Sequence, residues 1–148
     1  MKSIFDSSAQ EELKSRIKNL TDNHQPLWGK MTAYQMAKHC TLCDDMMHGK
    51  IKLKRVFIGR LIGRMILKKT IRDAKPFAQN APTAPILKTT SDSGNIETQK
   101  QIWIQSIDAY NNFTNHSFVH PFFGSMSKEE IGIFVYKHVD HHLRQFGL

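Results

Sequence analysis

The chain has 148 residues, of which 40% are hydrophobic and 23% are charged, and its formal net charge at pH 7 is +8. This composition is typical of a globular protein and excludes a fibrous or disordered chain. A chain of this length can bury about 68–70% of its unfolded surface, so we expect one domain over residues 1–148 that needs no metal to fold.

The positive charge is concentrated in one segment. Residues 50–72 contain nine of the 21 lysines and arginines and none of the 13 acidic residues. The rest of the chain is close to neutral. The basicity therefore describes one element and not the whole surface.

The sequence also bears on where the protein works. Its first residues lead directly into the polar residues 6–12, without the apolar region of a secretory signal. The most apolar stretch, residues 56–67, contains two arginines and is too short to span a bilayer. Cys40 and Cys43 lie three residues apart in a predicted helix and look like reduced thiols. These features predict a cytoplasmic protein.

Two helices are predicted at the start of the chain. The first opens at Ser8, which could form a capping box with Glu11, and it continues with apolar residues at helical spacing. The second starts at Thr32 with Gln35 as its reciprocal cap, and it ends at Gly49.

The basic segment predicts a third helix, over residues 53–71. Two apolar rows are expected to face one way and a cationic row another. Gly59 and Gly63 would permit close contact with another helix. The rows are Phe57, Leu61 and Met65; Ile58, Ile62 and Ile66; and Arg60, Arg64, Lys68 and Arg72.

The cations of residues 53–72 have more than one candidate role. A solvated face is the simplest interpretation, because long basic side chains keep an otherwise apolar helix in water. A membrane surface or nucleic acid is a less favoured partner for this helix. No aromatic interleaving, recognition-helix signature or glycine-rich phosphate loop accompanies the cations.

The second half of the chain predicts a long loop and two more helices. Residues 73–95 contain three prolines and no clear period, which is typical of an ordered loop that crosses the molecule. A fourth helix is predicted over residues 96–115, and residues 120–124 turn the chain. Ser127 and Glu130 form a capping box for a last helix that runs almost to the C-terminus. No strand pattern competes, so the predicted fold class is all-α.

Three histidines are candidate ligands of a metal ion. His138 and His142 lie four residues apart, which places their imidazoles on one helix face with Cβ atoms roughly 5–6 Å apart. His39 lies near the middle of the second predicted helix and could complete the set if the two helices pack side by side. Neutral imidazole is the commonest protein ligand for first-row divalent metals. The spacing therefore predicts a metal site formed by His39, His138 and His142.

Alternatives remain open for this site. His141 could replace His142, and Cys43 could be a fourth ligand that closes a structural shell. The C-terminal histidines could also simply suit the negative end of a helix dipole. His116 and His120 flank a turn and could have a structural role or support the site. A carboxylate could orient an imidazole through its far nitrogen, and the candidates are Asp44, Asp45 and Asp108.

Five segments of the chain resemble the DinB-like superfamily, and specifically its branch catalogued as a domain of unknown function. The most specific of them is the C-terminal stretch that contains the paired histidines. These segments are residues 28–32, 36–40, 80–83, 120–124 and 137–147. The usual histidine-arginine-glycine-glutamine ending of that superfamily is replaced here by His142, Leu143, Arg144 and Gln145.

The resemblance implies a fold and a chemistry. The fold is a four-helix bundle of up-down-down-up topology, with its long crossover at the proline-containing loop. A metal, commonly zinc or nickel, is held by one histidine of the second helix and two of the last, which match His39, His138 and His142. Characterised relatives include transferases and isomerases that use low-molecular-weight thiols, and many are homodimers.

These observations lead to a hypothesis of a metal-dependent enzyme. The metal would activate a thiol or water for transfer to, or hydrolysis of, a small electrophilic substrate. Such an enzyme would be an S-transferase or a hydrolase, and its catalytic residues beyond the metal ligands are unassigned. The alternative is a non-catalytic helical module that binds metal or an anionic surface.

Overall fold

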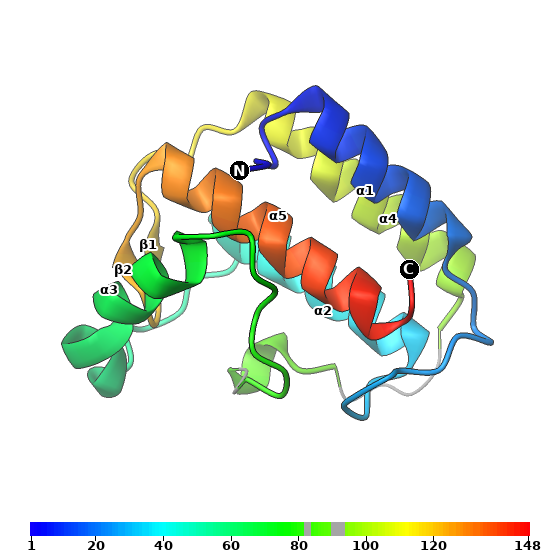
Figure 1. The fold of residues 1–148 in the computed structure, drawn as a ribbon. Helices are drawn as coiled ribbons and strands as arrows, with labels where there is room; N and C mark the ends of the chain where they lie inside the picture. Colours follow the sequence, from blue (N-terminus) through cyan, green and yellow to red (C-terminus); the bar gives the residue numbers. More distant parts are fainter. Residues whose placement is uncertain (82–83, 90–93) are drawn as a thin grey trace.

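The computed structural model describes residues 1–81, 84–89 and 94–148 and is mostly helical (Figure 1). Within these ranges, five α-helices are accompanied by two short 3-10 helices and a two-stranded sheet. The α-helices are α1 (Ser7–Asn19), α2 (Ala33–Met47), α3 (Phe57–Ile71), α4 (Ile96–Asp108) and α5 (Lys128–Gln145). The shorter elements are η1 (Pro85–Leu87), η2 (Ala109–Asn112), β1 (Val119–His120) and β2 (Gly124–Ser125).

Four of the helices surround the core. Helix α4 contacts both α1 and α2, and α5 contacts the same two helices. Figure 1 shows α1 beside α4, with α5 lying along α2. Leu13 of α1, Met36 of α2, Trp103 of α4 and Val139 of α5 are fully buried at the centre. In the part of the chain that is described, none of the helices has the length and hydrophobicity needed to cross a membrane.

The predicted caps are confirmed for two helices and wrong for one. Thr32 and Gln35 form a reciprocal capping box at the start of α2, and residues 127 and 130 form another at the start of α5. The N-cap of helix α1 is Asp6, two residues before the predicted cap Ser8. Ser8 therefore lies inside the helix, where its hydroxyl cannot cap the first turn.

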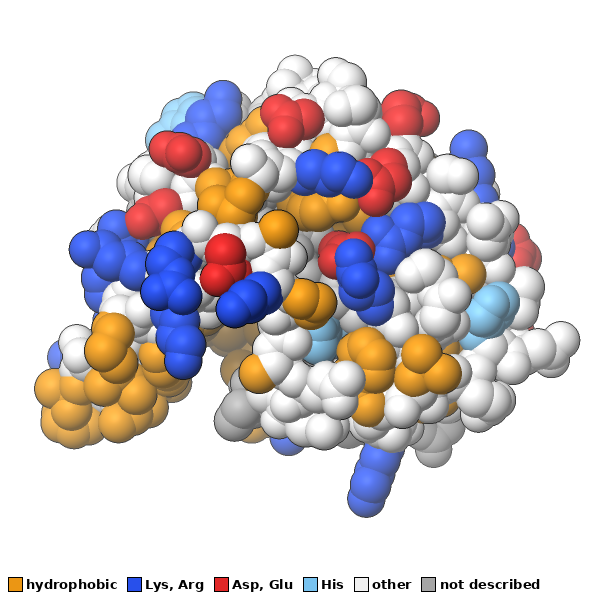
Figure 2. Space-filling model, viewed as in Figure 1, with side chains coloured by type: hydrophobic (Ala, Val, Ile, Leu, Met, Phe, Trp, Pro, Cys, Tyr) orange, Lys and Arg blue, Asp and Glu red, His pale blue; other side chains and the backbone are white. Residues whose placement is uncertain are grey.

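Helix α3 is shorter than predicted and packs differently. It starts at Phe57, because the preceding residues are extended and the Val56 N–H donates to the Pro121 carbonyl at 3.0 Å. Its buried face consists of Gly59, Gly63 and Leu67 and not of the predicted apolar rows. Phe57, Leu61 and Met65 point to solvent, and Figure 2 shows this apolar group protruding from the molecule.

The glycines of α3 explain this orientation. A Cβ atom on Gly59 would lie 2.4 Å from the carbonyl oxygen of Phe122, and one on Gly63 would lie 2.0 Å from the same atom. Only glycine leaves room for that backbone to approach the helix. The close contact predicted for these glycines is therefore made, but with the β1–β2 turn in place of another helix.

Two further differences concern irregular structure. The predicted fourth helix ends at Asp108 as an α-helix and continues only as the 3-10 turn η2 to Asn112. Residues 120–124 do turn the chain, but β1 and β2 pair antiparallel around them, with His120 opposite Gly124. Strands of two residues are too short for an alternating pattern to reveal. The predicted long loop contains η1, and two of its prolines, at 76 and 85, lie in described residues.

Candidate metal centre

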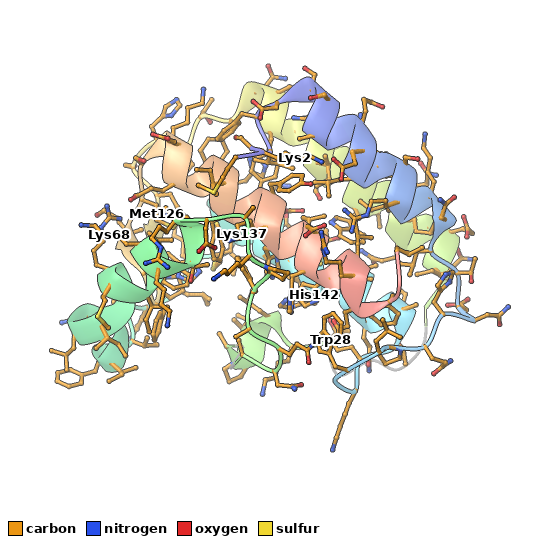
Figure 3. The ribbon with its side chains drawn as sticks, viewed as in Figure 1. Lys2, Trp28, Lys68, Met126, Lys137 and His142 are labelled. Carbon is orange, nitrogen blue, oxygen red and sulfur yellow. The ribbon has the colours of Figure 1, made fainter. Side chains whose placement is uncertain are left out.

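Helices α2 and α5 bring the three predicted ligands together. His39 comes from the middle of α2, whereas His138 and His142 come from consecutive turns of α5. Figure 3 labels His142, near the C-terminal end of α5. The potential ligand atoms of the three residues all lie within 4.8 Å of one another. The ring centroids are 5.3 Å apart for His39 and His138, 4.9 Å for His39 and His142, and 4.7 Å for His138 and His142. This group could hold a metal ion.

A backbone carbonyl orients His39. Nδ1 of His39 lies 2.7 Å from the carbonyl oxygen of Leu87, in η1. Since a carbonyl only accepts, Nδ1 carries the proton and Nε2 keeps its lone pair. Burial lowers the pKa of His39, and the hydrogen bond to Leu87 opposes that shift. The long loop therefore supplies the partner that fixes the tautomer of the α2 ligand.

An amide side chain orients His142. Nδ1 of His142 lies 2.9 Å from Oε1 of Gln145, and Nε2 of Gln145 donates to the Trp28 carbonyl at 2.7 Å. The Gln145 amide therefore accepts from the imidazole and anchors the loop before α2. Burial, together with the neighbouring His39, lowers the pKa of His142 to about 3. The ring is neutral at pH 7, with Nε2 free to bind.

The ring of His138 lies beside the other two histidines and beside two phenylalanine rings. Its ring is parallel to that of Phe134, with centroids 6.1 Å apart and an interplanar angle of 13°, and it is 6.5 Å from Phe77. Burial lowers the pKa of His138 well below its usual value, and the nearby histidines lower it further. Three imidazoles that are neutral at pH 7 form a donor set that could bind a first-row divalent metal ion.

The two alternative ligands lie outside this group. Sγ of Cys43 is 3.6 Å from Nε2 of His39, but the cysteine is not among the residues whose ligand atoms all lie within 4.8 Å of one another. Burial raises the pKa of the Cys43 thiol far above its usual value. The ring of His141 faces Trp28 at 5.5 Å and Phe77 at 5.9 Å. His141 thus packs against these two aromatic side chains beside the site.

The other histidines of interest have different surroundings. Nδ1 of His120 accepts the backbone N–H groups of Phe122 at 3.1 Å and Phe123 at 3.2 Å, which stabilises the β1–β2 turn. Burial and the nearby Arg55 lower the pKa of His120 to about 4. His116 is exposed at the surface. His120 therefore stabilises a turn, which is one of the two roles that the sequence left open.

None of the three candidate carboxylates orients a ligand. Asp44 instead accepts hydrogen bonds from Ser106 at 2.7 Å and Tyr110 at 2.9 Å. Asp45 and Asp108 pair with lysines, Lys50 and Lys14. The sequence did not predict the actual partners of His39 and His142, which are the Leu87 carbonyl and Gln145. A sequence cannot show which backbone carbonyl will accept a hydrogen bond. A glutamine three residues after a histidine on one helix face, however, is a detectable signal.

Comparison with known proteins places the chain in a family. The model of the family described as "Protein of unknown function (DUF1569)" matches residues 5–147, so the chain belongs to this family. The match covers all three clustered histidines and confirms that the chain belongs to a family of unknown function. No curated protein and no solved structure matches the chain.

Proposed function

We propose that this protein is a metal-dependent enzyme in which His39, His138 and His142 hold a zinc or nickel ion. Its substrate is a small electrophilic molecule, and its reaction is transfer of a low-molecular-weight thiol or hydrolysis by water. When bound, such a metal polarises a substrate oxygen and lowers the pKa of a coordinated thiol or water.

The observation that carries the proposal is the clustering of three neutral imidazoles from two helices. Nδ1 of His39 is hydrogen-bonded to the Leu87 carbonyl, and Nδ1 of His142 is hydrogen-bonded to Gln145. These bonds fix the orientation of both rings and so the direction of each free Nε2. Buried polar atoms need hydrogen bonds or a ligand. The Cys43 thiol, a weak donor, lies 3.6 Å from Nε2 of His39. A metal would be a stronger partner and would bind all three imidazoles at once.

The resemblance of the sequence to the DinB-like superfamily supports the same proposal. Helices α1, α2, α4 and α5 contact one another in the pairs that a four-helix bundle needs, and α3 with the long loop separates α2 from α4. We infer an up-down-down-up bundle with a crossover after the second helix. In that fold the metal ligands come from the second and last bundle helices, as they do here for residue 39 and the α5 pair.

The aromatic residues and the cysteine near the three histidines have different roles in the proposed reaction. Phe77 and Phe134 lie beside His138, and Trp28 lies beside the neighbouring His141. These rings limit the access of water to this side of the site. Cys43 is close, but it is not among the residues whose ligand atoms all lie within 4.8 Å of one another, and burial raises the pKa of its thiol. A small thiol supplied from outside the chain fits this arrangement as the nucleophile.

Metal analysis of purified protein tests the proposal directly. We expect close to one equivalent of zinc or nickel in protein purified without added metal, loss of the metal to a chelator, and recovery after remetallation. His39→Ala, His138→Ala and His142→Ala should each lose the metal while the exposed His116→Ala keeps it. Wild-type protein that holds no metal even after remetallation would overturn the proposal.

A second experiment separates an enzyme from a metal-binding module. Metal-loaded and chelated protein would be incubated with a panel of small thiols and electrophiles, and thiol consumption would be followed. Turnover that requires the metal and is lost in His138→Ala supports the enzyme. Binding of metal without turnover of any thiol or of water would favour the non-catalytic alternative. Light scattering of the same samples tests for the homodimer that the superfamily suggests.

A further inference from the structure

Helix α3 presents an apolar surface that the fold does not use. Its solvent side carries a patch that includes Phe57, Leu61, Met65 and Ile58, whose exposed fractions are 75%, 66%, 65% and 52%. Figure 2 shows these side chains as a protruding group at the end of the molecule where Figure 1 places α3. A contiguous exposed patch of this kind usually marks a site of interaction.

The patch is not a by-product of packing α3 onto the domain. The inner face of the helix is formed by Gly59, Gly63 and Leu67, and the two glycines fit against the backbone of Phe122. Polar residues on the outer face would leave these contacts unchanged. The outward phenylalanine and leucine therefore need another explanation.

Cations surround the apolar patch. Lys68, Lys69 and Arg72 are exposed at the C-terminal half of α3 and just beyond it, and Arg60 and Arg64 lie along one flank. Arg64 is paired with Glu130 of α5 at 2.6 Å, so part of its charge is balanced within the domain. Arg72 also lies 3.6 Å from Asp73, but the segment as a whole keeps a positive charge, because residues 50–72 contain nine lysines and arginines and no acid.

We propose that α3 docks on a lipid bilayer that contains anionic lipids. Phe57, Ile58, Leu61 and Met65 enter the interfacial region, and the flanking lysines and arginines contact the headgroups. On a protruding helix of this kind, bulky apolar side chains can enter the boundary of the acyl chains while the long cations beside them contact anionic headgroups. The bound helix lies along the surface without crossing it.

Charge decides against the other occupants of this surface. A second copy of the chain docked symmetrically on the same patch would bring its own cations against these cations. Nucleic acid would satisfy the cations, but its phosphates offer nothing to the outward leucine, isoleucine and methionine side chains. An anionic bilayer is complementary to both parts of the surface.

Flotation of the protein with vesicles tests the proposal. We expect binding to phosphatidylcholine vesicles with about 30% phosphatidylglycerol at low salt, and little binding to phosphatidylcholine alone. Raising the salt to about 500 mM should release most of the protein, because the Debye length falls well below 10 Å. Replacing Lys68, Lys69 and Arg72 with Gln should weaken binding on the order of a hundredfold.

Matched variants separate docking from general charge or hydrophobicity. Leu61→Ser should weaken vesicle binding about tenfold, whereas Ile102→Ser, at an exposed position of α4, should not. Replacement of the exposed Lys18, Lys30 and Lys88 with Gln removes the same charge elsewhere and should have a much smaller effect. Circular dichroism would confirm that each variant is folded.

Three results would overturn the proposal. The first is no flotation with anionic vesicles at low salt. The second is oligonucleotide binding that is stronger than vesicle binding and is unchanged by Leu61→Ser, which would indicate that nucleic acid is the partner of α3. The third is a dimer in light scattering that Leu61→Ser converts to a monomer, without vesicle binding, which would indicate a second copy.

Discussion

Gln145 and His142 are joined by a hydrogen bond of 2.9 Å, one turn apart on α5, and this bond connects the candidate metal site to a loop distant in sequence. The same amide donates to Trp28, and the Gln145 carbonyl accepts the Leu27 N–H at 2.7 Å. Gly29 completes the contact: its φ is +80°, and a Cβ there would lie 2.7 Å from the Gln145 amide nitrogen. The loop before α2 and the end of α5 therefore hold each other in place beside the site.

Gln145→Leu should weaken metal binding with little loss of secondary structure. Removal of the acceptor leaves His142 without a partner to fix its tautomer, and such changes typically reduce metal affinity about 10–100-fold. Gln145→Glu keeps an acceptor for the imidazole but loses the donor to Trp28, so it should retain most of the affinity. Competition for the metal with a chromogenic chelator measures both. Equal affinity in Gln145→Leu and the wild type would show that this bond does not support the site.

The sequence predicted the site better than it predicted the irregular parts of the fold. Helical periodicity placed the α5 pair on one face, and a capping box located α2. The meeting of His39 with His138 and His142 also required α2 and α5 to pack side by side, which the family resemblance implied and the structure shows. The orientation of α3 could not be predicted. Its apolar rows were the stronger signal, but the approach of a distant backbone to two glycines decided which face is buried.

Gly63→Ala should destabilise the contact between α3 and the β1–β2 turn. The new Cβ would meet the Phe122 carbonyl oxygen at 2.0 Å, which forces the backbone to move. Overpacking costs about 1–3 kcal/mol and alanine regains about 1 kcal/mol of helix propensity, so the net loss in the free energy of unfolding lies between about 0 and 2 kcal/mol. We expect the upper end, because the atom that the Cβ meets belongs to the backbone.

Denaturant titration and hydrogen exchange at residues 119–125 would measure the effect of Gly63→Ala. Lys69→Ala, on the exposed side of the same helix, is the matched control and should change stability by less than about 0.5 kcal/mol. If the two variants proved equally stable, the helix and the turn would not be in close contact.

Cys40 and Cys43 should resist alkylation in the native protein. Both side chains are buried, and burial raises the pKa of each thiol. Since the thiolate is the reactive form, iodoacetamide at pH 8 should modify neither residue in folded protein and both in guanidinium. Mass spectrometry would count the adducts. Rapid native modification of Cys43 would mean that the chain itself can supply a nucleophilic thiol to the proposed reaction.

Asp44 should make the protein less stable as the pH rises from about 4 to 7. Burial raises the pKa of this carboxyl from its usual 3.8 to about 7, and the hydrogen bonds from Ser106 and Tyr110 only partly oppose that shift. Between these values the folded protein keeps a proton that the unfolded chain has released. Raising the pH therefore favours unfolding, by about 1.4 kcal/mol per pH unit for one such group.

Asp44→Asn removes this proton linkage. The stability of the variant relative to the wild type should rise with pH across that window and level off above pH 7. The buried histidines, whose pKa values are lowered, act in the opposite direction, but they are common to both proteins and cancel in the difference. Tyr110→Phe removes a hydrogen bond that favours the charged carboxylate, so it should extend the loss of stability to higher pH. Guanidinium unfolding of metal-free protein across this range would measure both trends, and a pH-independent difference for Asp44→Asn would show that Asp44 ionises normally in the folded state.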